Sequence, residues 1–133
     1  MTLNKLFIYG TLRGLKHTKR EPGTIKGKLY RINGFPMLIE DHHPETNYSV
    51  HGSVYTIPNL ENNIYFIDRY EGCRTGEYES TSLYHRKRRR IKLDDGGEAI
   101  AFIYIGNKKR KDVIPLLIES RLIKSGYWNR KKY

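Results

Sequence analysis

Apolar and polar residues alternate in several short segments, and a period of two residues is typical of β-strands. Four segments carry this alternation or a short apolar run: residues 4–9, 24–30, 37–39 and 48–57. The first ends at Gly10, which predicts a strand that stops in a turn. Asn33-Gly34-Phe35-Pro36 predicts a turn between the second and third segments, which would form a hairpin-like pair. Residues 12–22 carry little periodicity and are expected to form a loop.

Between residues 59 and 71 the apolar positions recur at helical spacing instead. Asn59 stands where an N-cap is expected, and Gly72 stands where a helix usually ends. We therefore expect an α-helix over residues 59–71. A second helix is expected over residues 111–124, with Pro115 near its first turn, where the missing N–H costs least.

The tetrapeptide Asp94-Asp95-Gly96-Gly97 is a strong hairpin signal. It predicts two antiparallel strands, over residues 78–90 and 98–105. The order of all these elements indicates a mixed α+β fold with mostly antiparallel pairing.

The composition of the 133-residue chain indicates a globular protein, because 38% of its residues are hydrophobic and 29% are charged. A chain of this length can bury a core without help from metals or disulfides. We expect residues 1–133 to form one domain.

The chain is strongly basic, with 25 Lys and Arg against 14 Asp and Glu and a formal charge of +11. Such a field attracts nucleic acid, anionic lipid or small acidic substrates. Cys73 is the only cysteine and cannot form an internal disulfide. The apolar run at the N-terminus is too short for a signal peptide or a membrane helix, so we expect a cytoplasmic protein that does not enter the membrane.

Two carboxylates fall near the apolar face of the expected helix. Glu71 lies four residues after Ile67 and should project from the same face. Burial raises the pKa of a carboxylate, and a carboxylate with a raised pKa is a candidate general base or acid. Asp68, adjacent to Ile64 on this face, competes for the role. For both residues the pattern alone also fits a solvated or capping carboxylate.

The turn Tyr9-Gly10-Thr11-Leu12 follows the first apolar strand directly. Backbone N–H groups in such a turn can bind a carboxylate or an oxyanion. By itself this segment fits an ordinary strand end equally well.

Together, these two segments resemble one family. Phe7-Ile8-Tyr9-Gly10-Thr11-Leu12-Arg13 resembles the YGTL(R/K) signature of the γ-glutamyl cyclotransferase-like proteins, and Ile67-Asp68-Arg69-Tyr70-Glu71-Gly72 resembles their (L/I)D-x-x-EG motif. Further resemblances follow in the family's order: residues 27–36, 50–55, 78, 99–105 and 125–128. Ser80 stands where the family usually has Arg, and Cys73-Arg74 replaces the frequent Val or Pro.

The resemblance implies a small, mostly antiparallel, barrel-like sheet with a few helices. It also implies a reaction in which the α-amine of a γ-glutamyl group attacks its own γ-carbonyl to form 5-oxoproline and a free amine. Glu71 would be the catalytic acid and base, Tyr9, Gly10, Thr11 and Leu12 would bind the substrate, and Tyr78 would close the pocket. No metal or cofactor is implied, the substrate is a small molecule with an unidentified leaving amine, and we expect a monomer.

Several other polar groups suggest chemistry only weakly. The cluster Asp41-His42-His43-Pro44-Glu45 has the residue types of a metal site, but it lies in an expected loop without a second spaced pair. Cys73 lacks an identifiable His partner and is interpreted as a packing residue. Arg13 could attract the acid end of a substrate, although a solvated surface residue fits as well.

Three basic clusters keep a second function class open: residues 86–90, 108–111 and 130–132. With 11 tyrosines as stacking faces, they fit a module that binds nucleic acid. The same clusters fit a solvated strand edge and tail. A non-catalytic, ligand-binding protein on the same fold is a third alternative. The order of the motifs favours the enzyme.

Overall fold

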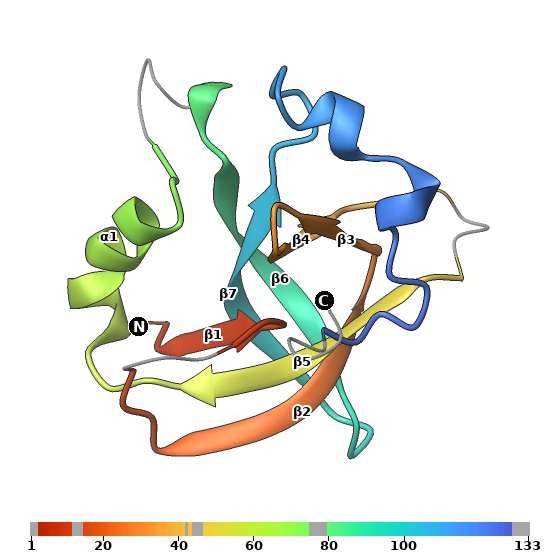
Figure 1. Ribbon diagram of the computed structural model, residues 1–133. Coiled ribbons are helices and arrows are strands. Elements are labelled where there is room, and N and C mark those ends of the chain that lie inside the picture. Colours follow the sequence, from red (N-terminus) through yellow and green to blue (C-terminus); the bar gives the residue numbers. More distant parts are fainter. Residues whose placement is uncertain (1–2, 12–14, 42, 44–46, 75–79, 129–133) are drawn as a thin grey trace.

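The computed structural model describes residues 3–11, 15–41, 43, 47–74 and 80–128. Five strands form a closed barrel in the order β1-β5-β2-β6-β7, and two more form a separate small sheet (Figure 1). The barrel strands are β1 (Lys5–Ile8), β2 (Lys19–Lys26), β5 (Ser49–Thr56), β6 (Tyr84–Leu93) and β7 (Glu98–Gly106). The small sheet pairs β3 (Lys28–Ile32) with β4 (Phe35–Ile39). This architecture confirms the expected α+β, barrel-like fold.

The barrel closes where β1 lies between β5 and β7. β1 is antiparallel to β5 and parallel to β7, with Leu6 opposite Phe102. The remaining strand pairs are antiparallel, as predicted. Closure leaves the outside of β1, β6 and β7 as a surface on which other elements pack.

The expected strand over residues 24–30 is divided between two sheets. β2 begins at Lys19, inside the expected loop, and the chain leaves the barrel at Gly27 to begin β3. Gly27 has φ +156°, and a Cβ there would lie 2.7 Å from Cδ1 of Leu38. The alternation of side chains continues through this corner, so periodicity does not reveal that the strand changes sheets.

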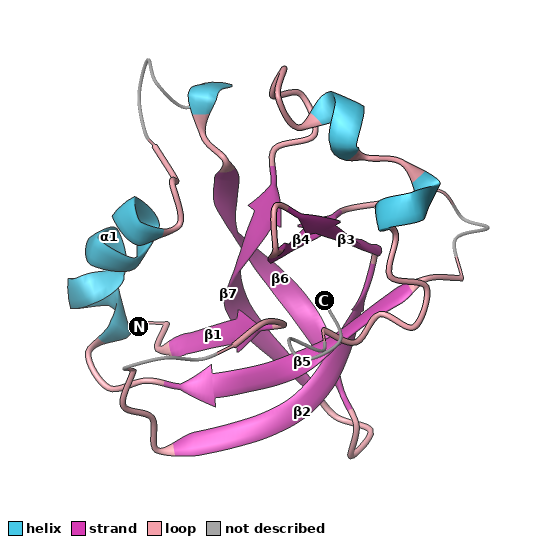
Figure 2. Cartoon of the chain, in the orientation of Figure 1, coloured by secondary structure: helices cyan, strands magenta, loops and turns pink. Residues whose placement is uncertain are grey.

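The single α-helix of the described residues, α1 (Leu60–Tyr70), packs beside the barrel (Figure 2). Leu60 and Ile64 are buried as expected. Asn59 does occupy the N-cap position, but the expected side-chain cap is wrong, because Asn59 is left-handed (φ 58°) and its side chain makes no capping hydrogen bond. Instead, Nδ2 of Asn63 donates to the carbonyl of Asn59.

The expected α-helix over residues 111–124 is also wrong. This segment contains two short 3-10 helices, η2 (Ile114–Leu116) and η3 (Glu119–Arg121). The N–H of Ile123 donates to the carbonyl of Leu29 at 2.7 Å, and Leu122 bridges to Tyr30. These contacts with β3 outweigh a weak helical preference, since helices of this length depend on tertiary packing.

The buried side chains form two hydrophobic clusters, on the two faces of the barrel strands. Phe7, Val54 and Ile103 belong to the first, whereas Leu6, Phe102 and Tyr104 belong to the second, with residues of α1. The small sheet contributes to both, with Leu29 and Leu38 in the first. The alternation along β1 and β7 therefore separates an inner core from a docking face. Among the described residues, we found no helix with the length and apolar character that a membrane span requires.

Candidate active site

Glu71 sits at the C-cap of α1, where the backbone is held by a Schellman motif. The N–H of Cys73 donates to the carbonyl of Asp68 at 2.8 Å, and the N–H of Gly72 donates to the carbonyl of Arg69 at 3.2 Å. Gly72 has φ +70°, a conformation that favours glycine. The motif fixes the direction in which the chain leaves Glu71.

The Glu71 side chain is half-buried, and burial raises its pKa above the ordinary value. The charge of Glu71 also acts on two buried phenols. Burial raises the pKa of Tyr9 and of Tyr84, and the Glu71 carboxylate raises both further. Glu71 therefore lies near the end of β1 and the start of β6, although neither segment is its neighbour in sequence.

The Tyr9 side chain is buried and bonded to backbone on both sides. Its hydroxyl donates to the carbonyl of Tyr104 at 2.5 Å and accepts from the N–H of Leu38 at 3.3 Å. These partners are 95 and 29 residues away in the sequence. The Tyr9 side chain is therefore committed to the backbone of β4 and β7, and it anchors the start of the turn.

Gly10 packs tightly against the small sheet. A Cβ on Gly10 would stand 2.9 Å from Cγ of Pro36. The carbonyl of Pro36 in turn accepts a 2.7 Å hydrogen bond from the Tyr84 hydroxyl. Thr11 follows and is exposed. The structure thus brings Tyr9, Gly10 and Glu71 to one region, whereas Leu12, Arg13 and Tyr78 lie outside the described residues.

Asp68, and not Glu71, is the fully buried carboxylate of α1, with 3% of its surface exposed. Its Oδ1 accepts from the Tyr104 hydroxyl at 2.6 Å, and its Oδ2 accepts from Nη1 of Arg86 at 2.8 Å. A charge this deep requires partners of this kind. The sequence signal is the spacing of Asp68 four residues after Ile64, on the buried stripe.

Tyr84 and Tyr104 are parts of the site that the sequence did not single out. Burial raises the pKa of Tyr104 well above its ordinary value, and the hydrogen bond to Asp68 adds to the effect. Tyr84 begins the mostly basic strand β6, and Tyr104 lies in the mostly apolar strand β7. Neither strand sequence predicts the hydrogen bond from Tyr104 to Asp68 or the one from Tyr84 to the carbonyl of Pro36.

The weaker sequence candidates find structural explanations. Cys73 is half-buried and packs against the second hydrophobic cluster. Asp41 and His43 are described, but His42, Pro44 and Glu45 are not, so the suggested loop cluster lies partly outside the described residues. Within the described residues, no group of three or more His, Cys, Asp or Glu side chains has the geometry of a metal site.

The arginines of β6 face carboxylates from other elements. The four pairs are Arg86–Asp68, Arg88–Glu61, Arg89–Glu40 and Arg90–Glu98. The Arg89–Glu40 pair is bidentate, with both contacts at 2.8 Å. Much of this basic cluster therefore braces the fold. The cluster over residues 130–132 lies outside the described residues.

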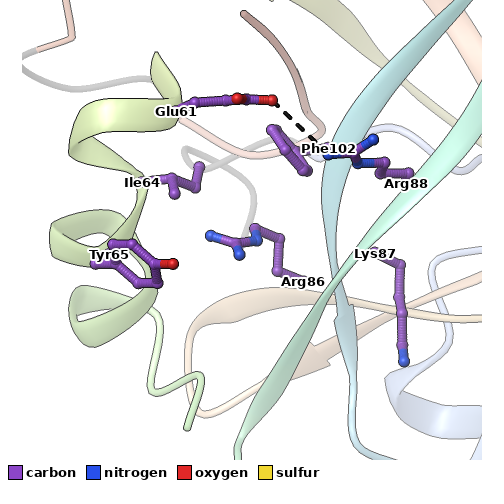
Figure 3. A pocket seen from close by; sticks show the side chains of 7 residues that line it. All are labelled: Glu61, Ile64, Tyr65, Arg86, Lys87, Arg88 and Phe102. Atoms are coloured by element: carbon purple, nitrogen blue, oxygen red, sulfur yellow. Dashed lines mark ion pairs between the residues drawn. The ribbon is translucent and has the colours of Figure 1, made fainter. Parts of the chain in front are cut away.

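A pocket of about 330 Å³ lies between α1 and β6, lined by Glu61, Ile64, Tyr65, Arg86, Lys87, Arg88 and Phe102 (Figure 3). Of the described candidate residues, Glu71, Tyr9, Gly10 and Thr11 do not line it. The buried Asp68, bonded to Arg86, stands on the same helix between this pocket and Glu71. We therefore place the candidate active site at Glu71, because Glu71 is half-buried and has buried neighbours. The pocket between α1 and β6 is a separate feature.

Solved structures with this fold are known from several organisms. YkqA from Bacillus subtilis matches with a TM-score of 0.59 and 25% identity over 96% of this chain, but this chain spans only 40% of that protein. An AIG2-like protein from Mus musculus matches with a TM-score of 0.62 and 20% identity, covering 91% of this chain and 88% of that one. A solution structure from Arabidopsis thaliana has a TM-score of 0.62 and 16% identity, covering 99% and 80%.

Sequence comparison assigns the family more directly than these distant structures do. A search of curated proteins finds no significant match. A family model described as gamma-glutamyl cyclotransferase, AIG2-like, matches residues 6–130. This match begins in β1, includes the Tyr9 turn and Glu71, and continues past Trp128. The chain therefore belongs to the gamma-glutamyl cyclotransferase, AIG2-like family.

Proposed function

We propose that this protein is a cyclotransferase that converts a γ-glutamyl amine or γ-glutamyl peptide into 5-oxoproline and a free amine. The α-amine nitrogen of the substrate attacks the γ-carbonyl carbon, a C–N bond forms within the ring, and the C–N bond to the leaving amine breaks. The nucleophile is part of the substrate, so the protein's tasks are to fold the glutamyl chain and to transfer protons.

Glu71 is the proposed proton carrier. Its carboxylate accepts a proton from the substrate ammonium and passes it to the leaving nitrogen as the C–N bond breaks. The second proton, which the ring nitrogen loses on becoming an amide, is taken up by the expelled amine, so no net proton is consumed. The observation that carries the proposal is its half-buried position at a fixed helix end, where burial raises its pKa. A raised pKa brings the group nearer to the operating pH, at which an acid–base catalyst works best.

The turn after β1 is the proposed anion-binding element. Backbone N–H groups of the segment from Tyr9 to Leu12 would bind the substrate carboxylate or the oxyanion that develops on the γ-carbonyl. The close packing of Gly10 on Pro36 supports this role, because it holds the backbone of the turn in one place. In this proposal Tyr78 forms part of the wall of the substrate site at Glu71, as the family resemblance implies.

The test is the release of 5-oxoproline from a panel of substrates that differ in the leaving amine: glutathione, γ-glutamyl amino acids, γ-glutamyl-ε-lysine and γ-glutamyl polyamines. We expect product from at least one of them. Glu71→Gln should abolish that turnover and leave the circular dichroism spectrum unchanged. Glu98→Gln, which removes an exposed carboxylate on β7, is the matched control and should keep full activity.

Two results would overturn the proposal. One is the absence of 5-oxoproline from every substrate in the panel at high enzyme concentration. The other is undiminished turnover in Glu71→Gln, which would exclude this carboxylate as the proton carrier even if the reaction itself occurs.

A further inference from the structure

The pocket between α1 and β6 is built around one aromatic ring and two guanidinium groups. The ring centre of Phe102, which lines the pocket, lies 5.1 Å from the guanidinium carbon of Arg86 and 5.2 Å from that of Arg88. Both distances fall in the range of cation–π contacts. Two cations on one ring repel each other, so an anion bound between them would be stabilised by both.

Arg86 is held in place with most of its hydrogen-bonding capacity unused. Among the described residues, only Nη1 has a hydrogen-bond partner, the buried Asp68. Its guanidinium carbon also lies 5.8 Å from the ring centre of Tyr65. Figure 3 shows the side chain extending from β6 toward α1, into the pocket. A guanidinium has five N–H donors, so a fixed Arg86 can still present several to a ligand.

Arg88 has only a weak partner. Its Nη2 lies 3.7 Å from Oε1 of Glu61, and both side chains are partly exposed. The same Glu61 oxygen accepts a 2.6 Å hydrogen bond from the N–H of Leu3. Exposed ion pairs of this length contribute little free energy, so a phosphate can replace Glu61 as the partner of Arg88.

Of the three exposed aromatic side chains of α1, only Tyr65 lines the pocket. Phe66 follows it on the solvent side, and Tyr70, five residues after Tyr65, projects from another side of the helix. Tyr65, Phe66 and Tyr70 are 64%, 70% and 84% exposed. Arg69, on the same helix, is exposed too. Adjacent aromatic faces and guanidinium groups are the combination by which proteins hold single-stranded nucleic acid, with bases on the rings and phosphates on the cations.

We propose that the α1–β6 pocket, together with the exposed ring of Tyr65 at its edge, binds single-stranded nucleic acid. The site is separate from Glu71 and does not depend on the proposed reaction. Charge complementarity identifies the occupant, because the chain carries a formal charge of +11 and the pocket offers two arginines. An acidic protein segment would use the arginines and leave the exposed Tyr65 ring without a role, whereas a single strand uses both, with a base on the ring and phosphates on the arginines.

The experiment is fluorescence anisotropy with labelled oligouridine and oligodeoxythymidine of about 12 nucleotides, a length within known site sizes. We expect saturable binding that weakens steeply as salt rises. Arg88→Ala and Tyr65→Ala should each weaken it about fivefold or more. Arg90→Ala, an exposed arginine on the same strand, and Phe35→Ala, an exposed aromatic elsewhere, are the controls and should change binding less than twofold.

Several outcomes would overturn the proposal. They are the absence of saturable binding at low salt, equal losses in Arg88→Ala and Arg90→Ala, and a preference for an oligoglutamate peptide over both oligonucleotides. The first excludes binding, the second indicates attraction to net charge alone, and the third indicates an acidic protein partner. Because Glu71→Gln should bind as the natural sequence does, this test is independent of the enzymatic one.

Discussion

The Tyr104 hydroxyl donates a 2.6 Å hydrogen bond to Oδ1 of Asp68, and both residues are buried. This contact joins the two halves of the candidate site. On the strand side, the carbonyl of Tyr104 accepts the hydroxyl of Tyr9, which begins the turn. On the helix side, the carbonyl of Asp68 accepts the N–H of Cys73, which closes the cap around Glu71. The turn and the carboxylate are therefore positioned through one shared pair.

Asp68→Asn tests the energetic weight of this pair. The substitution leaves Arg86 without its charged partner, and breaking a buried pair on one side costs about 3 kcal/mol or more. Urea unfolding should show this loss in the free energy of unfolding. The control, Glu98→Gln, removes an exposed partner of Arg90 and should change stability by about 0.5 kcal/mol at most. A loss in Asp68→Asn no larger than in the control would mean that the carboxylate does not brace the fold.

Tyr9→Phe tests whether Tyr9 acts through position. It leaves the carbonyl of Tyr104 and the N–H of Leu38 without their buried partner, which costs about 1 to 3 kcal/mol. Thermal and urea unfolding measure the loss. Tyr127→Phe, at an exposed tyrosine, is the comparison and should have almost no effect. An unchanged stability of Tyr9→Phe would contradict the assignment of its hydroxyl to the backbone of β4 and β7.

Gly10→Ala tests the need for close approach in the turn. The added Cβ would stand 2.9 Å from Cγ of Pro36, so the turn must move or Pro36 must shift. Displacement of a binding element by about 1 Å can cost up to about a hundredfold in rate. We expect turnover to fall about tenfold or more, with the fold retained. Gly97→Ala, in the turn between β6 and β7, should keep normal turnover; equal rates for both variants would argue against a role for the Gly10 backbone.

The pH dependence of turnover should report the burial of Glu71. As the accepting base, Glu71 must be ionised, so kcat/KM falls as pH drops through its pKa. Burial raises that pKa, so the acidic limb should lie above the ordinary glutamate value of about 4.3. Initial rates across an acidic to neutral pH series measure it. An acidic limb at or below about pH 4 would contradict the assignment.

Buried phenols should make the fold sensitive to alkali. Burial is the main cause that raises the pKa of Tyr9, Tyr84 and Tyr104 in the folded state. The folded protein therefore holds these protons more tightly than the unfolded chain, whose phenols titrate near pH 10. The stabilisation is complete below about pH 10 and is lost as pH rises further. Urea unfolding at rising pH should show this decline, and a smaller decline in Tyr104→Phe; constant stability above about pH 11 would contradict it.

The sequence alone determined the elements whose signals are local. Alternation indicated much of β1, β2 and β5, and Asn33-Gly34 marked the hairpin of the small sheet. Asp94-Asp95-Gly96-Gly97 marked the β6–β7 hairpin, although β6 begins and ends later than the strand expected over residues 78–90. Helical spacing with Gly72 placed α1 and its end. These predictions succeed because each depends only on residues that are close together in the sequence. The expected helix over residues 111–124 failed because contacts with Leu29 and Tyr30, about 90 residues earlier, hold that segment extended near Leu122.

Tertiary structure decided which carboxylate is buried and what surrounds it. The helical stripe offered Asp68 and Glu71 as alternatives, and it could not distinguish them because burial depends on what packs against the helix end. Tyr104 and Arg86, from two other strands, reach Asp68 and make its burial tolerable, while Glu71 stays half-buried at the cap. Such contacts leave no periodic signal in the sequence, since they join segments that meet only when the barrel closes.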